Sequence, residues 1–519
     1  MANKFRALQI GGIDLETQFQ ILTDVDWDYL DPSLFYVESG YLEAIENVLR
    51  EIGDFDLVYV QAAYSAELLD VLRLVSTPYN TYVDKQFWDE QYKNDALIQE
   101  RFVRSLNYRN EEERFEKLRA VTYSGQYGDK ISPKYAQVNP NFSGFSQYKG
   151  NYVLILKGDF GERLKPIATF RNNLVYDKDK VIQVWPQYTI EGDVEVEYTF
   201  RVMQGGYTDK IIEEIVMTQT ELEHPLELPQ KSFESYISVS VKAKGQGTIN
   251  LGAIHKRWSR LDMGLFILGG ERYVDEHREE FMYYLDPGDL KPPLNVYFSG
   301  YRSAEGFEGY FMMKKLNAPF LLITDPRIEG GSFYIGSDSY EQGIKNVIQQ
   351  SLQKLGFEEN DLILSGLSMG SFGALYYGAQ LNPQSVIVGK PLINIGTIAN
   401  NMQLLRPQEF GTALDVLIAN EKGIGPQNIT SLNNKFWNVM NKANTSDTTF
   451  AIAYMEHDDY DPKAFDEILP LLTKRQARVM SRGVPGRHND DSPTITNWFV
   501  NFYHIILESQ FGRVKHDNK

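Results

Sequence analysis

Runs of apolar residues separated by polar stretches divide the chain into three parts, and the first part alternates strand-like with helix-like segments. Short apolar runs predict strands, and apolar positions at helical spacing predict amphipathic helices. The predicted elements are residues 5–10, 41–52, 56–60 and 64–75. The charged segment 86–121 also has a helical pattern. Alternating strands and helices predict a small α/β domain over residues 1–134.

The middle of the chain changes to the two-residue alternation of antiparallel strands. Residues 237–241 read Ile-Ser-Val-Ser-Val, and turn residues separate similar β-branched and aromatic runs. The predicted strands are residues 152–157, 181–185, 194–202 and 236–242. This pattern predicts an antiparallel β-sandwich over residues 135–258. Such a domain often contacts carbohydrate or a neighbouring domain, although fold alone does not decide function.

From about residue 259 the chain returns to short apolar strands separated by helices. The predicted strands are residues 294–298, 320–324, 362–364, 385–388 and 451–454. Helices are expected over 338–355 and from Gly370 onward. Continuously apolar strands joined by helices predict a parallel sheet buried on both faces. The long span 391–449 between two of the strands predicts a helical cap over the site.

Two features allow both a binding and a structural interpretation. Gly11-Gly12 follows a strand, as in nucleotide-binding turns, but the full G-x-G-x-x-G is absent and a packed strand-to-helix turn is the alternative. Trp185, Tyr188 and Trp258 of the β domain are either platforms for sugars or part of its core.

Composition narrows the function classes. The chain has 52 Lys plus Arg and 70 Asp plus Glu, a net charge of −18, which argues against nucleic-acid binding. It has no cysteine, so disulfides, Cys-ligated zinc and Cys nucleophiles are excluded. Arg6 and Gln9 interrupt the apolar start, so no signal peptide is expected, and no apolar run is long enough for a transmembrane helix. A cytoplasmic protein is therefore expected.

Residues 366–370 carry the candidate chemistry. They read Gly-Leu-Ser-Met-Gly, a G-x-S-x-G motif between an apolar strand and a helix-forming run. A serine on such a strained turn needs small neighbours two positions away, which Gly366 and Gly370 provide. The turn predicts Ser368 as the nucleophile of an α/β-hydrolase fold, with the Met369 N–H as one oxyanion donor.

Serine needs a base, and in this fold the partners follow in the order Ser, acid, His. Six of the seven histidines fit this role poorly. His224, His255 and His277 precede Ser368, and His457 precedes the candidate acid. His504 lies in an apolar helix, and His516 lies in the charged C-terminal tail. His488 remains, in a Gly/Pro-rich loop before the final helix. We therefore predict His488 as the base, with a surface-loop histidine as the alternative.

The acid should lie in the loop after the strand at 451–454, because there it can hold the imidazole in one tautomer. The usual position, a few residues past the strand, favours Asp458. The residues that stay open as alternatives are Glu456, Asp459 and Asp461.

The second oxyanion donor should come from the loop after an earlier strand. We predict a backbone N–H near Tyr301, while the neighbouring Arg302 is a candidate for binding an anionic group. In the cap, the apolar residues Phe436, Trp437 and Met440 either line a pocket or fill the core of the cap. No metal site and no bound cofactor are expected, and the sequence does not identify an acyl donor.

Several segments together resemble one family. They are the start Phe-Arg-Ala-Leu-Gln-Ile-Gly-Gly, the middle β domain, Gly-Leu-Ser-Met-Gly-Ser-Phe-Gly-Ala, residues 454–461 and Gly-Arg-His at 486–488. Across essentially its whole length the chain resembles the second accessory secretory proteins of the accessory Sec system of streptococci, staphylococci and relatives. The serine motif alone is shared with many esterases, but its combination with the N-terminal start is much more specific.

The resemblance implies a protein of the cytoplasm and the inner membrane face that assists export of serine-rich repeat glycoprotein adhesins. Its implied partners are the first and third accessory secretory proteins, a SecA-type motor ATPase and a SecY-type channel. It also implies O-acetylation of N-acetylglucosamine on the adhesin, through Ser368, His488 and an acid at or near Asp458. The competing hypotheses are a plain esterase or deacetylase and a non-catalytic export subunit on a hydrolase fold.

Overall fold

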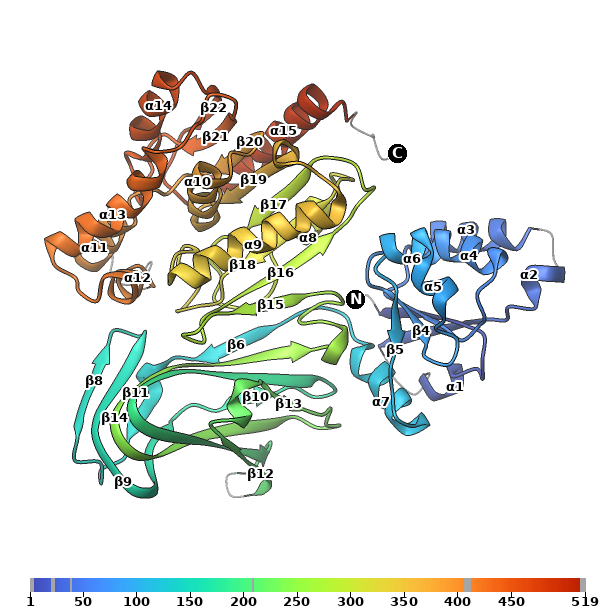
Figure 1. Ribbon diagram of the computed structural model, residues 1–519, viewed down its shortest axis with the longest axis horizontal. Helices are drawn as coiled ribbons and strands as arrows, with labels where there is room; N and C mark the ends of the chain where they lie inside the picture. Colours follow the sequence, from blue (N-terminus) through green and yellow to red (C-terminus); the bar gives the residue numbers. More distant parts are fainter. Residues whose placement is uncertain (1–3, 20–23, 38–39, 208–209, 406–411, 514–519) are drawn as a thin grey trace.

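A computed structural model describes residues 4–19, 24–37, 40–207, 210–405 and 412–513. The described strands form three sheets, of five, nine and eight strands. In Figure 1 the five-stranded unit lies to the right, the nine-stranded sheet at the lower left and the eight-stranded sheet above it. Among the described residues no helix combines the length and apolarity that crossing a bilayer requires.

The first unit is a parallel sheet in the order β2-β1-β3-β4-β5 with helices around it. Its strands are β1 (Phe5–Ile10), β2 (Val25–Leu30), β3 (Leu57–Val60), β4 (Thr81–Asp84) and β5 (Arg104–Leu106). Its helices are α1 (Glu16–Phe19), α2 (Leu34–Val37), α3 (Tyr41–Ile52), α4 (Ala66–Val75), α5 (Glu90–Asn94), α6 (Ala96–Glu100) and α7 (Glu111–Val121). The segment 86–121, predicted as helical, contains the short strand β5, because pairing with β4 outweighs local propensity.

Gly11 lies in a tightly packed turn at the end of β1. Its φ is +77°, and a Cβ there would lie 2.6 Å from the Gln61 carbonyl oxygen. Only glycine allows so close an approach between two loops at this backbone angle. The glycine pair therefore has a packing role, as the structural interpretation of the sequence predicts.

The middle sheet is antiparallel, in the order β12-β11-β14-β9-β7 with four shorter strands at its margins. Its strands are β6 (Gly128–Ile131), β7 (Ala136–Val138), β8 (Phe145–Lys149), β9 (Val153–Phe170), β10 (Leu174–Tyr176), β11 (Val181–Gln204), β12 (Ile211–Thr218), β13 (Leu226–Leu228) and β14 (Ser235–Ser259). The predicted strands 181–185 and 194–202 are two halves of the single strand β11.

The long strands β9, β11 and β14 bend at glycines, so that the sheet folds over on itself. A Cβ on Gly245, whose φ is +93°, would lie 2.0 Å from the Asp193 carbonyl oxygen of the paired strand. Both halves of each long strand contribute side chains to one buried cluster. The two layers expected of a sandwich are thus formed by one hydrogen-bonded sheet.

The aromatic residues of this region divide between interior and surface. Trp185 and Tyr188 are buried, and the Trp185 indole N–H donates to the Arg278 carbonyl oxygen (3.2 Å). Trp258 is half-buried, and its indole N–H donates to Asp177 (2.8 Å). Trp185 and Tyr188 therefore belong to the interior and are not platforms for sugars.

The C-terminal sheet has the order β15-β16-β18-β17-β19-β20-β21-β22, in which β17 to β22 are parallel. Its strands are β15 (Glu271–Val274), β16 (Glu280–Asp286), β17 (Leu294–Phe298), β18 (Phe320–Thr324), β19 (Leu362–Leu367), β20 (Ser385–Gly389), β21 (Thr449–Met455) and β22 (Arg478–Val484). Its helices outside the cap are α8 (Tyr310–Lys314), α9 (Asp338–Leu355), α10 (Met369–Leu381), α14 (Ala464–Lys474) and α15 (Ser492–Phe511). This order confirms the predicted α/β-hydrolase fold.

The cap predicted over 391–449 holds three helices between β20 and β21. They are α11 (Ile395–Leu405), α12 (Thr412–Glu421) and α13 (Pro426–Met440), while residues 406–411 lie outside the described residues. Phe436 and Met440 are fully buried, and the Phe436 ring contacts Phe372 of α10 with centroids 5.7 Å apart. The Trp437 indole N–H donates to the Asn394 side-chain oxygen (3.2 Å). These cap residues therefore serve packing.

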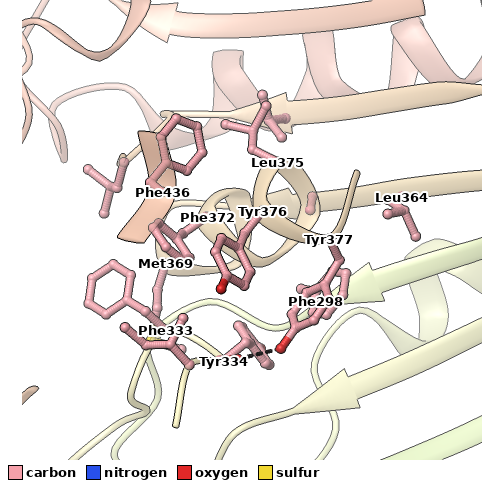
Figure 2. Close-up of a cluster of buried hydrophobic side chains, with 14 of the residues drawn as sticks. Phe298, Phe333, Tyr334, Leu364, Met369, Phe372, Leu375, Tyr376, Tyr377 and Phe436 are labelled. Carbon is pink, nitrogen blue, oxygen red and sulfur yellow. Dashed lines mark hydrogen bonds between the residues drawn. The ribbon is translucent and has the colours of Figure 1, made fainter. Parts of the chain in front are cut away.

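Helix α10 is buried all round, which is typical of a central core helix. Its Phe372 and Tyr377 pack among the aromatic side chains that Figure 2 shows between the sheet and the cap. Phe298 of β17 stacks on Tyr377 with centroids 5.7 Å apart, and the Tyr377 hydroxyl donates to the Tyr334 carbonyl oxygen (2.7 Å). The turn that precedes α10 is therefore held between rigid elements.

A buried ionic network joins the middle sheet to the C-terminal sheet. Arg257, on β14, donates to Glu280 of β16 (2.7 Å) and to Glu305 of the loop after β17 (2.6 Å). His255 Nδ1 lies 2.6 Å from Glu305, and Lys130 lies 3.3 Å from it. All five side chains are buried. Such charges are tolerated inside a protein because they are paired.

Candidate functional site

Ser368 lies in the turn between β19 and α10, with φ 52° and ψ −119°. A positive φ is costly for a residue with a side chain, and strained backbone of this kind is concentrated at functional sites. A Cβ on Gly366 would lie 2.2 Å from the Gly370 carbonyl oxygen, and one on Gly370 would lie 2.0 Å from the Phe298 carbonyl oxygen. Both positions need glycine for the turn to form.

Replacing Gly366 with alanine is expected to move this turn, because its Cβ would overlap a backbone atom that no side-chain rotation can clear. We expect a loss of about 2 kcal/mol in the free energy of unfolding and a fall of about 10²-fold in turnover by the site. Thermal unfolding and ester hydrolysis measure the two effects. In the matched control Gly425→Ala the Cβ lies 3.5 Å from its nearest neighbour, so near-normal values are expected. Normal turnover by Gly366→Ala would contradict the need for this geometry.

The structure brings the predicted serine, histidine and aspartate into one hydrogen-bonded chain. Ser368 Oγ lies 2.8 Å from His488 Nε2, and His488 Nδ1 lies 2.7 Å from Asp458 Oδ2. His488 and Asp458 are buried, and Ser368 is half-buried. With its Nδ1 proton directed at the carboxylate, the imidazole presents Nε2 as an acceptor for the serine hydroxyl proton.

The four candidate carboxylates in the loop after β21 differ in their surroundings. Asp459 Oδ1 accepts the His488 backbone N–H (3.0 Å), and Asp461 accepts the N–H groups of Ile393 and Asn394 (2.8 Å each). Glu456 is exposed. Asp458 Oδ2 lies 2.7 Å from His488 Nδ1, and its other oxygen accepts the Tyr460 N–H (2.8 Å).

The other histidines lie elsewhere or in other roles. His457 is exposed, and its backbone N–H donates to the Gly486 carbonyl oxygen (3.1 Å), which ties the acid loop to the loop of His488. His255 belongs to the buried ionic network, and His277 is exposed on the loop between β15 and β16. His516 lies outside the described residues.

The two predicted oxyanion positions flank the serine turn. Met369 is the first residue of α10 and is buried. Tyr301 follows Gly300 in the loop after β17, where a Cβ on Gly300 would lie 3.3 Å from the Leu367 carbonyl oxygen. The Gly300 N–H itself donates to Glu308 (2.6 Å). The role of the Tyr301 N–H stays a prediction.

Arg302 lies in the same loop, and its guanidinium donates to the Phe307 carbonyl oxygen (3.2 Å). A guanidinium has five N–H donors, so this contact does not test anion binding, which stays a prediction.

Three residues near the site, Tyr460, Lys390 and Glu308, were not predicted from the sequence. The Tyr460 ring stacks on His488 with centroids 4.3 Å apart and 4° between planes. Lys390 is buried just past β20, where its ammonium donates to Ser492 Oγ (3.0 Å). Burial lowers the pKa of Lys390, while the carboxylates of Asp458 and Glu308 oppose that shift.

The missed residues differ in how well the sequence could have indicated them. Tyr460 lies in the acid loop, and Lys390 follows a predicted strand at the end where sites gather in parallel sheets, so position alone could have indicated both. Glu308 carries no comparable signal. Among the described residues, no group of three or more His, Asp or Glu side chains could hold a metal ion.

Comparison with known proteins places the whole chain within one family. The family model for the accessory Sec system GspB-transporter matches residues 5–513. The chain is 64% identical over 519 residues to an accessory Sec system protein of Staphylococcus aureus (strain NCTC 8325 / PS 47), covering 100% of this chain and 99% of that protein. It is 39% identical over 522 residues to one of Streptococcus gordonii, covering 99% and 100%.

A solved structure is similar over the same length. The Glycosylation Associate Protein complex from Streptococcus agalactiae contains a chain that is 35% identical to this one, with a TM-score of 0.89. The match covers 99% of both chains. The similarity in fold therefore extends over essentially the whole protein and includes all three sheets.

Proposed function

The chain belongs to the family of accessory Sec system GspB-transporter proteins, and we propose on this basis that it is an acyltransferase of an adhesin export system. In this proposal it O-acetylates N-acetylglucosamine on serine-rich repeat glycoproteins and supports their export. The single observation that carries the enzymatic part is the hydrogen-bonded chain of Ser368, His488 and Asp458.

The first half-reaction makes an acyl-enzyme. Ser368 Oγ attacks the carbonyl carbon of an acyl ester or thioester donor while His488 Nε2 takes the hydroxyl proton. Backbone N–H groups at Met369 and Tyr301 stabilise the oxyanion of the tetrahedral intermediate. The intermediate collapses, the bond to the donor oxygen or sulfur breaks, and the imidazolium returns its proton to that leaving group. Asp458 stabilises the imidazolium throughout.

The second half-reaction decides between a transferase and an esterase. A sugar hydroxyl gives its proton to His488 Nε2 and attacks the acyl carbon, and Ser368 Oγ leaves and regains a proton from His488. Water in the place of the sugar gives hydrolysis. The product therefore depends on which hydroxyl the surrounding groups position against the acyl-serine.

Partnership with other accessory secretory proteins is part of the proposal. The similar chain of S. agalactiae was solved within a protein complex, and the match extends over the full length of both chains. We infer assembly with the first and third accessory secretory proteins, and work beside a SecA-type motor at the cytoplasmic membrane face. The adhesin glycoprotein is the substrate.

Cells that carry Ser368→Ala test this proposal. Export of the adhesin should continue while its glycans lose the mass of their acetyl groups in mass spectrometry. Ser446→Ala, which changes an exposed serine of a turn, is the control and should keep the acetyl groups. Unchanged acetylation in Ser368→Ala cells would refute the acetyltransferase assignment and leave a binding subunit or an esterase of another substrate.

A further inference from the structure

Two polar hollows adjoin where the middle sheet, the C-terminal sheet and the cap meet, and together they are called the groove. The hollows have volumes of about 240 and 480 Å³, and their walls share Tyr152 and Ile328. The smaller lies between the start of the middle sheet and the loops after β17 and β18, and the larger extends to Asn420 of cap helix α12. Parts of the chain that are distant in sequence therefore line the groove together.

The walls suit a neutral ligand rich in hydroxyl groups. Carboxylates and cations are nearly balanced in number: the smaller hollow has Asp129 and Glu329 with Lys130 and Lys134, and the larger has Glu191 and Glu279 with Arg327, Lys422 and Lys435. Such a balance does not favour a polyanion, which needs an excess of positive charge.

Amides and an exposed ring complete this surface. The smaller hollow holds Gln187 and the ring of Tyr135, which is 39% exposed, and the larger holds Asn250 and Asn420. Amides both donate and accept hydrogen bonds, and a tyrosine ring offers an apolar face. Together these are the contacts that a sugar ring, with its polar edges and apolar faces, can use.

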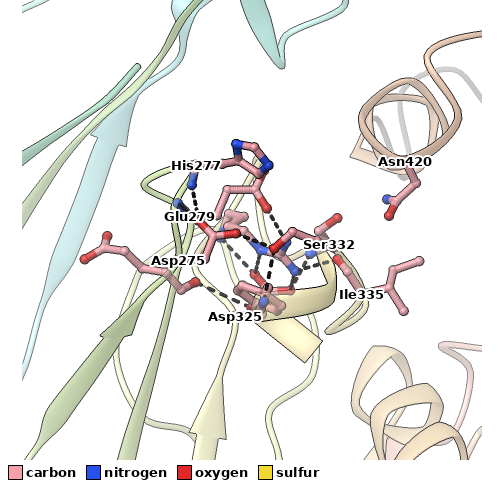
Figure 3. A network of polar contacts seen from close by, with 12 residues as sticks. Asp275, His277, Glu279, Asp325, Ser332, Ile335 and Asn420 are labelled. Carbon is pink, nitrogen blue, oxygen red and sulfur yellow. Dashed lines mark hydrogen bonds and ion pairs between the residues drawn. The ribbon is translucent and has the colours of Figure 1, made fainter. Parts of the chain in front are cut away.

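The floor of the larger hollow is rigid. Arg327 donates to Asp325 and to Glu279 (2.7 Å each), and the Tyr152 hydroxyl donates to Glu279 (3.3 Å). Figure 3 shows this network with Asn420 across from it on the cap. The groove is thus preformed by buried ion pairs, which lowers the entropy cost of binding.

The cap is fastened directly to the middle sheet beside the groove. The Asp415 carboxylate of α12 accepts the Asn151 backbone N–H (2.8 Å) and its side-chain amide (3.2 Å). Because Asp415 is buried, the relative positions of cap and sheet are defined at one side of the groove.

One loop separates the groove from the serine turn. Ile328 and Glu329 line the groove, whereas the next two residues face the site. A Cβ on Gly330 would lie 2.3 Å from the Tyr301 ring, and one on Gly331 would lie 2.4 Å from the Met369 side chain. The loop therefore contacts both predicted oxyanion residues, and a ligand in the groove lies one loop away from them.

We infer that this groove binds an oligosaccharide, the carbohydrate part of the acceptor that receives the acyl group from Ser368. The assignment of the ligand as the acceptor rests on the proposed function, whereas the binding itself does not. A chain of sugars in the groove extends past the loop 328–331 and presents a hydroxyl to the serine turn.

Calorimetric titration of the full-length protein with the trisaccharide of N-acetylglucosamine tests this site. Saturable binding is expected, weakened about tenfold in Tyr135→Ala because the ring face is lost. Asn420→Ala, on the opposite wall, should weaken binding as well. Tyr207→Ala, which removes another exposed tyrosine ring outside the groove, in the connection between β11 and β12, is the matched control and should bind like the unaltered protein.

Either of two results would overturn the inference: no saturable binding up to about 10 mM trisaccharide, or unchanged affinity in both groove variants. Thermal unfolding of each variant identifies one that fails to fold, and the other variant then decides. Binding at the groove without acetyl transfer by the unaltered protein would refute the proposed function alone. Acetyl transfer with normal binding in both variants would refute the groove alone.

Discussion

Replacing Ser368 with alanine is expected to reduce acyl transfer by about 10⁶-fold, because the nucleophile that forms the acyl-enzyme is lost. His488→Ala should cost about as much, and the double variant little more, since residues of one catalytic chain act as a unit. Hydrolysis of a p-nitrophenyl acyl ester by the purified protein measures these losses. A fall of less than about tenfold would place the reaction at another residue.

Two neighbouring aspartates provide a matched comparison for the acid. Asp458→Asn should lower turnover by about 10⁴-fold, because an amide does not hold the imidazole in the required tautomer. Asp459→Asn replaces the carboxylate that accepts the His488 backbone N–H with an amide and leaves Asp458 paired with the imidazole, so a much smaller loss is expected. If Asp459→Asn had the larger effect, Asp458 would not be the acid of the chain.

Replacing Arg257 with methionine is expected to cost about 3–5 kcal/mol of stability, because Glu280 and Glu305 stay buried without their main partner. The midpoint of thermal unfolding should fall by about 5–10 °C. Arg201→Met breaks a pair with Glu214 that is partly exposed, so it should cost about 1 kcal/mol or less. Equal losses in the two variants would contradict the buried network as the joint between the sheets.

The network also sets a dependence on pH. Burial by itself would raise the pKa of Glu305, but Arg257, His255 and Lys130 outweigh it and hold the pKa well below its usual range. A carboxylate with a depressed folded-state pKa stabilises the fold above its unfolded pKa of about 4.5, and this stability is lost as the pH falls further. Arg257→Met should lose less stability than the unaltered protein between about pH 5 and pH 3.

The sequence by itself determined the features that depend on neighbouring residues. The strands of the C-terminal sheet are continuously apolar, so their burial could be read without a partner, and Gly366 and Gly370 flank Ser368 for a local steric reason. The order of serine, acid and histidine, together with the apolar helix around His504 and the tail position of His516, then limited the base to His488. Family membership was also predictable, because the resemblance depends on short segments of the chain itself, such as the N-terminal start and the serine motif.

Contacts between distant segments were decided only by the tertiary structure. Four carboxylates within residues 456–461 are equivalent in local pattern, and the path of the loop alone directs Asp458 to His488. Strand β11 looked like two strands because Gly192 bends it where the sheet folds over. The groove is lined by Tyr135, Glu329 and Asn420, which are far apart in the sequence. No local sequence pattern links such distant residues, and only the packing of the sheets and the cap brings them together.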